Sequence, residues 1–259
     1  MDLKLKGRTV LVTGASKGIG LSVAQWFARE GCNLRLSARS GDALKKEGDA
    51  MAKAHGVDVQ SLALDLSKES ERRKLTDAWP DVDVVINNAG DIPAGSIEDI
   101  DEEKWKAGWD LKVFGYISLT RHYLNRMKPK GRGVIINIAG SAGERPSYGY
   151  IAGSMGNLSI MGFSEAIGAE STRWGVRVLC VNPGPIETER LVKLGRKRAE
   201  QQLGDADRWR EGFKSFPFGR PGTCDEVSAM VVFLASDLSS YTSGTVISVH
   251  GGLPARPPA

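Results

Sequence analysis

Seven short apolar runs recur along the chain, and segments with a helical pattern separate them. The runs span residues 9–14, 33–38, 59–64, 82–89, 133–139, 176–182 and 245–250. Several are apolar on consecutive residues, as expected for a strand whose two faces are both covered by helices. The intervening segments, such as GLSVAQWFAREG and DEVSAMVVFLASD, are amphipathic. This alternation predicts a doubly wound α/β fold, in which helices cover both faces of a seven-stranded parallel sheet.

The alternation runs through the 259 residues without a linker, a repeat or a low-complexity tract. We therefore expect one domain over residues 1–259, a length that α/β folds reach as single units. Residues 186–220 interrupt the rhythm after the sixth run, and a long insertion at the carboxyl end of a strand is typical of a substrate lid. The proline-rich residues 254–259 cannot continue a helix or a central strand, so we expect an exposed tail.

Several classes of protein are excluded by composition. No stretch approaches the ~18 consecutive apolar residues of a membrane span, and the N-terminus lacks the apolar core of a signal peptide. The three cysteines are far apart and odd in number, which favours reduced thiols in a cytoplasmic protein, and the three histidines are too scattered to predict a metal site. The net charge of +4 lacks the broad basic patch with interleaved aromatics of a nucleic-acid binder.

The first apolar run leads into the glycine-rich stretch TGASKGIG, residues 13–20. Gly14 permits a tight turn there, while Gly18 and Gly20 let the start of a helix approach a ligand without an intervening Cβ. The free amides and the positive dipole end of such a helix suit a pyrophosphate. Because this turn follows a strand and opens a helix, it predicts a dinucleotide-binding fold of the Rossmann type.

Four motifs occur in order along the sequence: TGASKGIG, NNAG at 87–90, a tyrosine after the fifth apolar run, and NPGPIET at 182–188. With this combination the chain resembles the short-chain dehydrogenase/reductase family over essentially its whole length. That family transfers a hydride between a nicotinamide cofactor and a carbonyl or alcohol carbon. The resemblance therefore implies an oxidoreductase acting on a small molecule, assembled as a homodimer or homotetramer on its fourth and fifth helices.

The resemblance also implies which residues hold the cofactor. Asn88 and its two successors would contact the cofactor and brace the sheet, while Asp65 and Leu66 would line the adenine site. The segment from Pro183 to Thr188 would enclose the nicotinamide and the pyrophosphate. The implied cofactor-binding residues are Gly14, Ser16, Lys17, Gly18, Ile19, Gly20, Arg39, Asp65, Leu66, Asn88, Ala89, Gly90, Pro183, Gly184, Ile186 and Thr188.

The end of the second run, LSARS, indicates which nicotinamide cofactor binds. A fold that prefers NAD usually places an acid there to bond the ribose 2′-hydroxyl, but this sequence has Ala38 followed by Arg39. Lys17 lies in the glycine turn, which faces the same corner. Two cations without a carboxylate favour the 2′-phosphate of NADP and make NAD the weaker candidate. The alternative is that both cations are solvated surface charges.

The catalytic positions depart from the family pattern. In the family, a tyrosine passes the proton, a serine orients the substrate oxygen, and a lysine four residues after the tyrosine lowers its pKa. Tyr150 matches the tyrosine by the residues that follow it, and Tyr148 is a weaker match. Gly140 stands at the serine position with Ser141 beside it, and Ser154 takes the lysine position.

An asparagine on the family's fourth helix anchors a water in the proton path, and here that position holds Lys112. A free phenol titrates near pH ~10, and a neighbouring cation is the usual means of lowering that value. In the family the asparagine and the lysine converge on one water, so Lys112 would supply the missing cation to Tyr150. The predicted catalytic residues are therefore Tyr150 and Lys112, with Ser141 or Ser154 as the orienting hydroxyl. The alternative is a decayed site that binds NADP as a sensor or scaffold.

A run of basic residues marks the insertion. Residues 188–220 hold nine Lys/Arg against five Asp/Glu, and Arg190, Lys193, Arg196, Lys197 and Arg198 follow one another without an intervening acid. At the place where the family closes a lid over its substrate, this field favours an acidic substrate such as a carboxylate or a coenzyme A thioester. The alternative is a solvated helix face.

Overall fold

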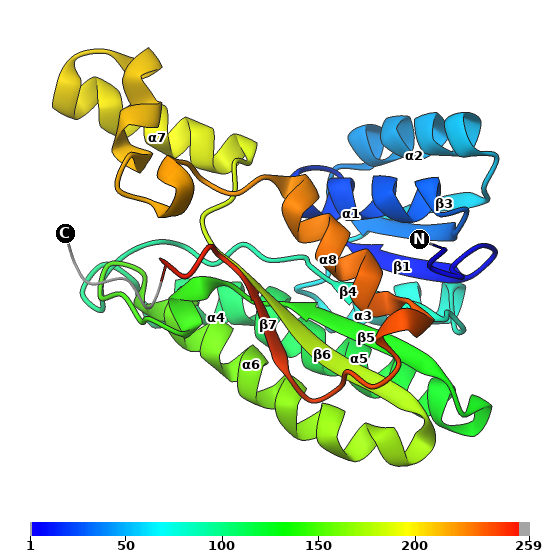
Figure 1. Ribbon diagram of the computed structural model, residues 1–259. Helices are drawn as coiled ribbons and strands as arrows, with labels where there is room; N and C mark the ends of the chain where they lie inside the picture. The colour runs from blue at the N-terminus through cyan, green and yellow to red at the C-terminus, as the bar shows by residue number, and fades with distance from the viewer. Residues whose placement is uncertain (1, 254–259) are drawn as a thin grey trace.

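Seven parallel strands form one sheet in the computed structural model, which describes residues 2–253 (Figure 1). Their order is β3-β2-β1-β4-β5-β6-β7. The strand order changes direction between β1 and β4, the position at which doubly wound sheets bind ligands. The predicted fold class is confirmed. The strands are β1 (Thr9–Thr13), β2 (Asn33–Ala38), β3 (Val59–Ala63), β4 (Val84–Asn87), β5 (Gly133–Ile138), β6 (Val176–Pro183) and β7 (Val246–Val249).

Each predicted run overlaps one strand, and only the ends differ. The largest difference lies at residues 82–89, where β4 ends at Asn87. Beyond it, the amides of Asn88 and Ala89 both donate to Thr13 Oγ1, at 2.9 and 3.1 Å. These hydrogen bonds turn the chain out of the sheet, so the residues that end the strand are also the ones that build the adjoining cavity.

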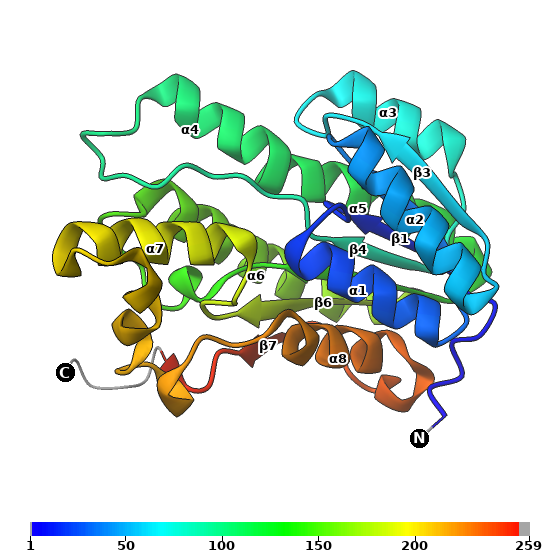
Figure 2. The ribbon, with the colours of Figure 1, turned by 90° about the horizontal axis from the view of Figure 1, so that it is seen from above.

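Helices cover both faces of the sheet (Figures 1 and 2). One layer contains α1 (Gly18–Arg29), α2 (Gly41–His55) and α8 (Cys224–Ala235). The other contains α3 (Glu69–Ala78), α5 (Gly115–Met127) and α6 (Ile151–Ser171). Side chains of β1 alternate between two apolar clusters, with Val10 and Val12 in the first and Leu11 in the second. All three are fully buried, and each such burial stabilises the fold by about 1.5–3 kcal/mol.

The predicted fourth helix is not uniform. It begins as α4 (Glu102–Trp109), widens into the π-helical segment η1 (Asp110–Phe114) and runs on as α5. Lys112 lies in this widened segment. Wide turns of this kind are frequent at functional sites.

The insertion folds into its own helices at the carboxyl end of the sheet. They are α7 (Glu189–Leu203), η5 (Ala206–Phe213) and η6 (Pro217–Gly219), and Figures 1 and 2 show them projecting from the sheet layers. Ala199, Trp209 and Phe213 form a small apolar cluster inside it. Its role as a substrate lid stays a prediction, and the predicted tail at 254–259 lies outside the described residues.

The described residues contain neither a membrane-spanning helix nor a metal-binding cluster. Among residues 2–253, no helix combines the length and the apolar character that a bilayer crossing needs. Within the same residues, no cluster of three or more His, Cys, Asp or Glu side chains is arranged to hold a metal ion.

Candidate active site

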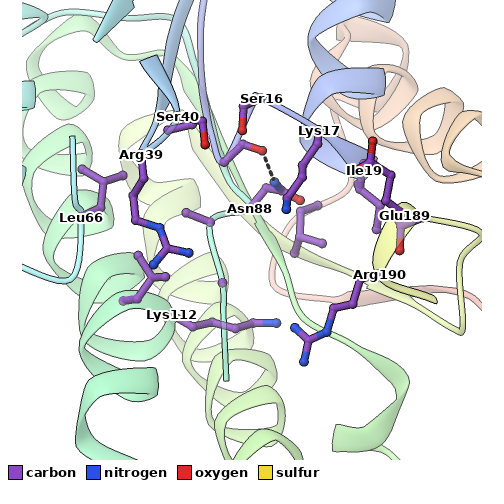
Figure 3. A pocket seen from close by; sticks show the side chains of 18 of the residues that line it. Ser16, Lys17, Ile19, Arg39, Ser40, Leu66, Asn88, Lys112, Glu189 and Arg190 are labelled. Atoms are coloured by element: carbon purple, nitrogen blue, oxygen red, sulfur yellow. Dashed lines mark hydrogen bonds between the residues drawn. The ribbon is translucent and has the colours of Figure 1, made fainter. Parts of the chain in front are cut away.

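A cavity of about 360 Å³ opens where the strand order changes direction, and Figure 3 shows the side chains that project into it. Most of the predicted cofactor residues lie in its wall. The exceptions are Gly20, Asp65, Pro183, Gly184 and Ile186. The lining residues are Gly14, Ser16, Lys17, Gly18, Ile19, Ala38, Arg39, Ser40, Leu64, Leu66, Asn88, Ala89, Gly90, Leu111, Lys112, Ile138, Ala139, Thr188, Glu189 and Arg190.

The glycine turn has the backbone that the sequence predicts. Gly14 and Gly18 adopt left-handed φ values of 67° and 58°, which residues with a Cβ rarely tolerate. Gly20 does not line the cavity but is needed for packing. A Cβ there would lie 2.3 Å from the carbonyl oxygen of Gly14 and 2.4 Å from Nδ2 of Asn88. That Nδ2 donates to the carbonyl oxygens of Thr13 (3.0 Å) and Gly14 (3.3 Å) and so braces the turn.

The N-terminus of α1 is open toward the cavity. Lys17 precedes the first helical residue, its side chain makes no capping hydrogen bond, and the first turn of the helix contains no acidic residue. The first amides of this 12-residue helix therefore keep their hydrogen-bonding capacity and the positive end of the dipole. This arrangement fits a pyrophosphate group.

One corner of the cavity is cationic. Arg39 and Lys17 both line it, together with Ser40 (Figure 3), and Ala38 stands where an NAD-specific acid would lie. The Arg39 guanidinium is 2.9 Å from the carboxylate of Asp91, and both side chains are more than half exposed. Such an exposed pair is worth little, so a phosphate can replace the carboxylate. The corner therefore fits the 2′-phosphate of NADP.

The remaining predicted cofactor residues divide between this cavity and its surroundings. Leu66 lines the cavity, whereas the Asp65 carboxylate turns away and accepts hydrogen bonds from the amide and hydroxyl of Ser67, at 3.2 and 2.8 Å. Pro183 ends β6, and Gly184 and Ile186 line a separate hollow of about 220 Å³ beside β7. Thr188 returns to the cavity and caps α7, because its hydroxyl accepts from the amide of Leu191 at 3.3 Å.

Lys112 lies at the opposite end of the cavity from the glycine turn. Its Nζ donates to the carbonyl oxygen of Ala139 at 3.0 Å, and its stem crosses Gly90, where a Cβ would lie 2.9 Å from Lys112 Cδ. The pKa of Lys112 is lowered to about 8, chiefly by burial, while Cys180 acts to raise it and the guanidinium of Arg190 acts to lower it. An amine that titrates near neutral pH at a cavity wall can donate and accept a proton.

Tyr150 occupies a different place from the one that the spacing predicts. The sequence predicts Tyr150 and Ser154 on one helix face, but Tyr150 is the residue before α6 and has a non-helical φ of −144°. Its ring lies over Gly153, where an added Cβ would lie 2.0 Å from Tyr150 Cζ. Burial raises the pKa of Tyr150, Arg190 lowers it and Asp91 raises it. The cation that acts on this phenol is thus Arg190 on α7, and the catalytic role of Tyr150 stays a prediction.

Neither predicted serine lies in the cavity wall. Ser154 is fully buried and its hydroxyl accepts from the amide of Ser147 at 3.0 Å, which fixes the loop before α6. Ser141 is half-buried and begins the short helix η3 (Ser141–Gly143). The structure therefore does not bring Tyr150, Ser141 and Ser154 together with Lys112 at the cavity wall.

Comparisons with known proteins agree with this architecture. A family model described as enoyl-(acyl carrier protein) reductase matches residues 14–254. The chain belongs to the short-chain dehydrogenase/reductase family. It is 33% identical to an NADP-dependent (R)-specific alcohol dehydrogenase from Lentilactobacillus kefiri, over 99% of this chain and 100% of that protein. The family's oxidoreductase chemistry therefore applies to the chain in its general form.

Two solved structures of this family carry cofactors. The L-sorbose reductase of Gluconobacter frateurii, complexed with NADPH and L-sorbose, superposes with a TM-score of 0.92 at 28% identity and covers 99% of this chain and 100% of its own. A 7α-hydroxysteroid dehydrogenase complexed with NADH and 7-oxo glycochenodeoxycholic acid gives a TM-score of 0.86 at 25% identity, covering 97% and 96%. NAD(P) binding is thus common to the fold, with both cofactors represented.

Asn157 is a residue of this site that the sequence analysis missed. It is almost fully buried, and its Nδ2 would lie 3.0 Å from a Cβ added at Gly140, the predicted serine position. Its Oδ1 has no hydrogen-bond partner among the described residues. Asn157 thus lies beside Gly140, just beyond the end of β5, and no motif in the sequence marks it.

Arg190 was predicted only as one member of a basic run. In the structure it lines the cavity opposite Lys112, and the two side chains extend toward one another (Figure 3). Its guanidinium donates to the carbonyl oxygen of Ile92 at 3.3 Å and lies 3.7 Å from the Asp91 carboxylate. Arg196 of the same run pairs instead with Asp207 of η5 at 3.0 Å. One side chain of the run thus reaches the site.

Proposed function

We propose that the protein is an NADP-preferring oxidoreductase that transfers a hydride between the nicotinamide and the carbonyl or alcohol carbon of a small molecule. One observation carries the proposal. A single cavity joins an open helix N-terminus and a cationic corner, at one end, to a lysine that titrates near neutral pH at the other. These are the groups needed to hold a phosphorylated dinucleotide and to exchange a proton beside it.

The chain's own residues would hold the cofactor by charge and backbone shape. The amides that begin α1 would donate to the pyrophosphate, and Arg39 and Lys17 would bind the 2′-phosphate in place of Asp91. When bound, the nicotinamide supplies or accepts the hydride. The L-sorbose reductase and the alcohol dehydrogenase named above support NADP as the cofactor. The steroid dehydrogenase, which was solved with NADH, supports NAD as the alternative.

An acidic substrate fits the other end of the cavity. Lys112 and Arg190 face one another there, and within residues 2–253 only Asp91, at 3.7 Å from Arg190, pairs with either of them. Two cations that share a single carboxylate form an attractive site for a substrate carboxylate or for the phosphates of a coenzyme A thioester. The steroid dehydrogenase named above was solved with 7-oxo glycochenodeoxycholic acid, which supports an acidic substrate, whereas L-sorbose, bound in the sorbose reductase, is neutral.

A homo-oligomer in the cytoplasm completes the proposal. Phe114 at the end of η1 is 50% exposed, and Met155 and Leu158 on α6 are 40% and 47% exposed. They lie on the predicted fourth and fifth helices, so a second copy would cover them. The three free thiols, of which Cys32 and Cys180 are buried, suit a reducing compartment.

The experiment that tests the proposed function measures binding and turnover separately. Fluorescence titration of NADPH and NADH gives the preference, and NADPH oxidation is then followed with a panel of neutral ketones, keto acids and acyl thioesters. Tighter NADPH binding with turnover of at least one carbonyl supports the proposal. Binding without turnover of any substrate, in either direction, would favour the NADP-binding sensor or scaffold instead.

A further inference from the structure

We propose that Lys112 itself exchanges the proton with the substrate oxygen, in place of a tyrosine. This inference rests on the proposed function, because it assigns the acid and base of the same reaction. It differs from the role that the sequence predicts for Lys112, which is to lower the pKa of Tyr150.

Position favours Lys112 over the phenol. The lysine lines the cavity wall from η1, whereas Tyr150 is absent from the lining residues and its ring lies over Gly153. Gly90 gives the lysine its room. The stem of Lys112 crosses this glycine, and the carbonyl oxygen of Ala139 holds its Nζ. The ammonium thus reaches the wall at the point where β4 and β5 end.

The ammonium keeps hydrogen-bonding capacity for a substrate. Lys112 carries three N–H donors, and in the described residues Nζ has one hydrogen bond, to the carbonyl oxygen of Ala139. No carboxylate within residues 2–253 forms an ion pair with it, in contrast to Lys106 of the same helix, which pairs with Glu102. A lysine held by a carboxylate retains its proton, whereas Lys112 is free to release one.

The surrounding groups make that release easy near neutral pH. The groups whose charge acts on Lys112 are Arg190 from α7 and Cys180 from β6. The buried phenol of Tyr116 donates to the neighbouring Ile138 carbonyl at 3.3 Å, and burial raises its pKa, so it is neutral. Burial raises the pKa of the Cys180 thiol to about 12, so near pH 8 this neighbour is neutral and its opposing effect on Lys112 arises only at higher pH. On the sides of β4 and β5 the neighbours are Gly90 and a backbone carbonyl, which do not titrate. Burial and the facing guanidinium both disfavour the ammonium, in agreement with the lowered pKa of Lys112.

The proton step balances without a further reactant. In the reductive direction, a bound nicotinamide would supply the hydride for the new C–H bond, the carbonyl π pair would move onto the oxygen, and this oxygen would take the proton from the Lys112 ammonium. The products are the alcohol, the oxidised cofactor and a neutral amine. The side chain of Lys112 is partly exposed, so water returns the proton to it. In the oxidative direction the neutral amine accepts the hydroxyl proton.

The first test titrates the amine in the full-length protein, with and without NADP. Lysines are labelled competitively with acetic anhydride across pH 6–11 and quantified by mass spectrometry. Lys112 is expected to reach half of its limiting reactivity near pH 8. Lys104 of the same helix is the internal reference, because Asp101 raises its pKa. A Lys112 midpoint equal to that of Lys104, or no labelling of Lys112 at pH 10, would overturn the proposal.

The second test separates a proton donor from a mere cation. Lys112→Met removes both properties, whereas Lys112→Arg keeps the positive charge but cannot release a proton near neutral pH. If Lys112 exchanges the proton, both variants should lose turnover by about ten- to a thousand-fold and keep NADPH affinity within about twofold. Lys106→Met is the matched surface control. Full activity of Lys112→Arg would overturn the proposal and favour Tyr150 as the residue that exchanges the proton.

The pH profile provides an independent readout. Reduction requires the ammonium, so the rate should fall as the pH rises through about 8, and oxidation should rise through the same range. Arg190→Gln should move the Lys112 labelling midpoint to higher pH, since the guanidinium acts to lower it. If the wild-type protein turns over no substrate, the proposed function fails while the labelling midpoint still decides whether Lys112 titrates near neutrality. Suppose instead that the labelling midpoint of Lys112 lies above pH 10 in the wild type and does not move in Arg190→Gln. The inference about Lys112 then fails, whereas the proposed function still stands.

Discussion

The cofactor end of the cavity is built from residues close together in the chain, whereas the opposite end is assembled from residues far apart. Gly14 to Gly20 form the first turn in one continuous stretch, and Arg39 follows the adjacent strand. At the other end, Lys112 comes from η1, Ala139 from the end of β5 and Arg190 from α7. Local backbone chemistry therefore determines the first end, and tertiary packing determines the second.

This difference predicts that substitutions at the two ends have separable effects. Changes at the glycine turn should abolish cofactor binding as a whole. Changes beside Lys112 should leave the cofactor bound and remove turnover. Four substitutions test the separation, in order of the effect that we expect.

The largest effect is expected for Gly20→Ala. The new Cβ would lie 2.3 Å from a backbone carbonyl oxygen and 2.4 Å from Nδ2 of Asn88, and backbone cannot move aside cheaply. We expect NADPH affinity to fall by more than about 100-fold. The free energy of unfolding should fall by about 1–3 kcal/mol, the usual cost of overpacking a core. Calorimetry measures both. Gly162→Ala, where no atom lies within 4 Å of the added Cβ, is the control and should bind NADPH normally.

The next effect sharpens the contrast at the reaction end. In Gly90→Ala the added Cβ would lie 2.9 Å from Cδ of Lys112, so the flexible lysine moves and its Nζ leaves the Ala139 carbonyl. Turnover should fall by about 10–100-fold, because the displaced amine no longer assists as acid or base. NADPH affinity should fall by clearly less, although Gly90 is also a predicted cofactor contact. Stopped-flow turnover and fluorescence titration measure the two quantities. Equal losses in both would mean that the two ends are not separable.

A smaller effect is expected at the cationic corner. Arg39→Asp removes a phosphate partner and adds a like charge near the 2′-phosphate, at a cost of about 1–3 kcal/mol, the scale of charge-assisted hydrogen bonds. NADPH affinity should fall by about tenfold or more, and the preference should reverse toward NADH. Titration of both cofactors with wild type and variant measures the ratio. An unchanged ratio would show that Arg39 serves only its pair with Asp91.

The sequence predicted the sheet well because the strands lie in apolar runs bounded by polar residues. Residues 33–38 coincide with β2, and the other runs differ from their strands only at the ends. The turn from β1 to α1 was equally predictable, since positive φ at Gly14 and Gly18 leaves few residue choices. Both features depend on chemistry that is local in the chain.

The reaction end was less predictable because it depends on helix starts and side-chain directions. Counting four residues from Tyr150 assumes that it is already helical, but α6 begins at Ile151. Asn157, rather than Ser154, faces the end of β5. The pairing of Arg190 with Asp91 across the cavity mouth likewise joins residues 99 positions apart, and no local pattern encodes such a contact.

The smallest effect that we expect is a change of substrate preference in Arg190→Gln. Arg190 is half-exposed, its guanidinium lies 3.7 Å from Asp91, and it faces Lys112 across the cavity. If it binds a substrate carboxylate, the neutral variant should raise the KM for acidic substrates by about 5–10-fold, equivalent to about 1–1.4 kcal/mol for a partly screened charge. The KM for neutral ketones should stay within about twofold, and added salt should weaken the wild type on acids alone. Arg196→Gln is the matched control, because its guanidinium pairs with Asp207 within the insertion. If KM changes equally for acidic and neutral substrates, Arg190 does not recognise the substrate charge. Its role would then be to hold α7 in place through its hydrogen bond to the Ile92 carbonyl oxygen.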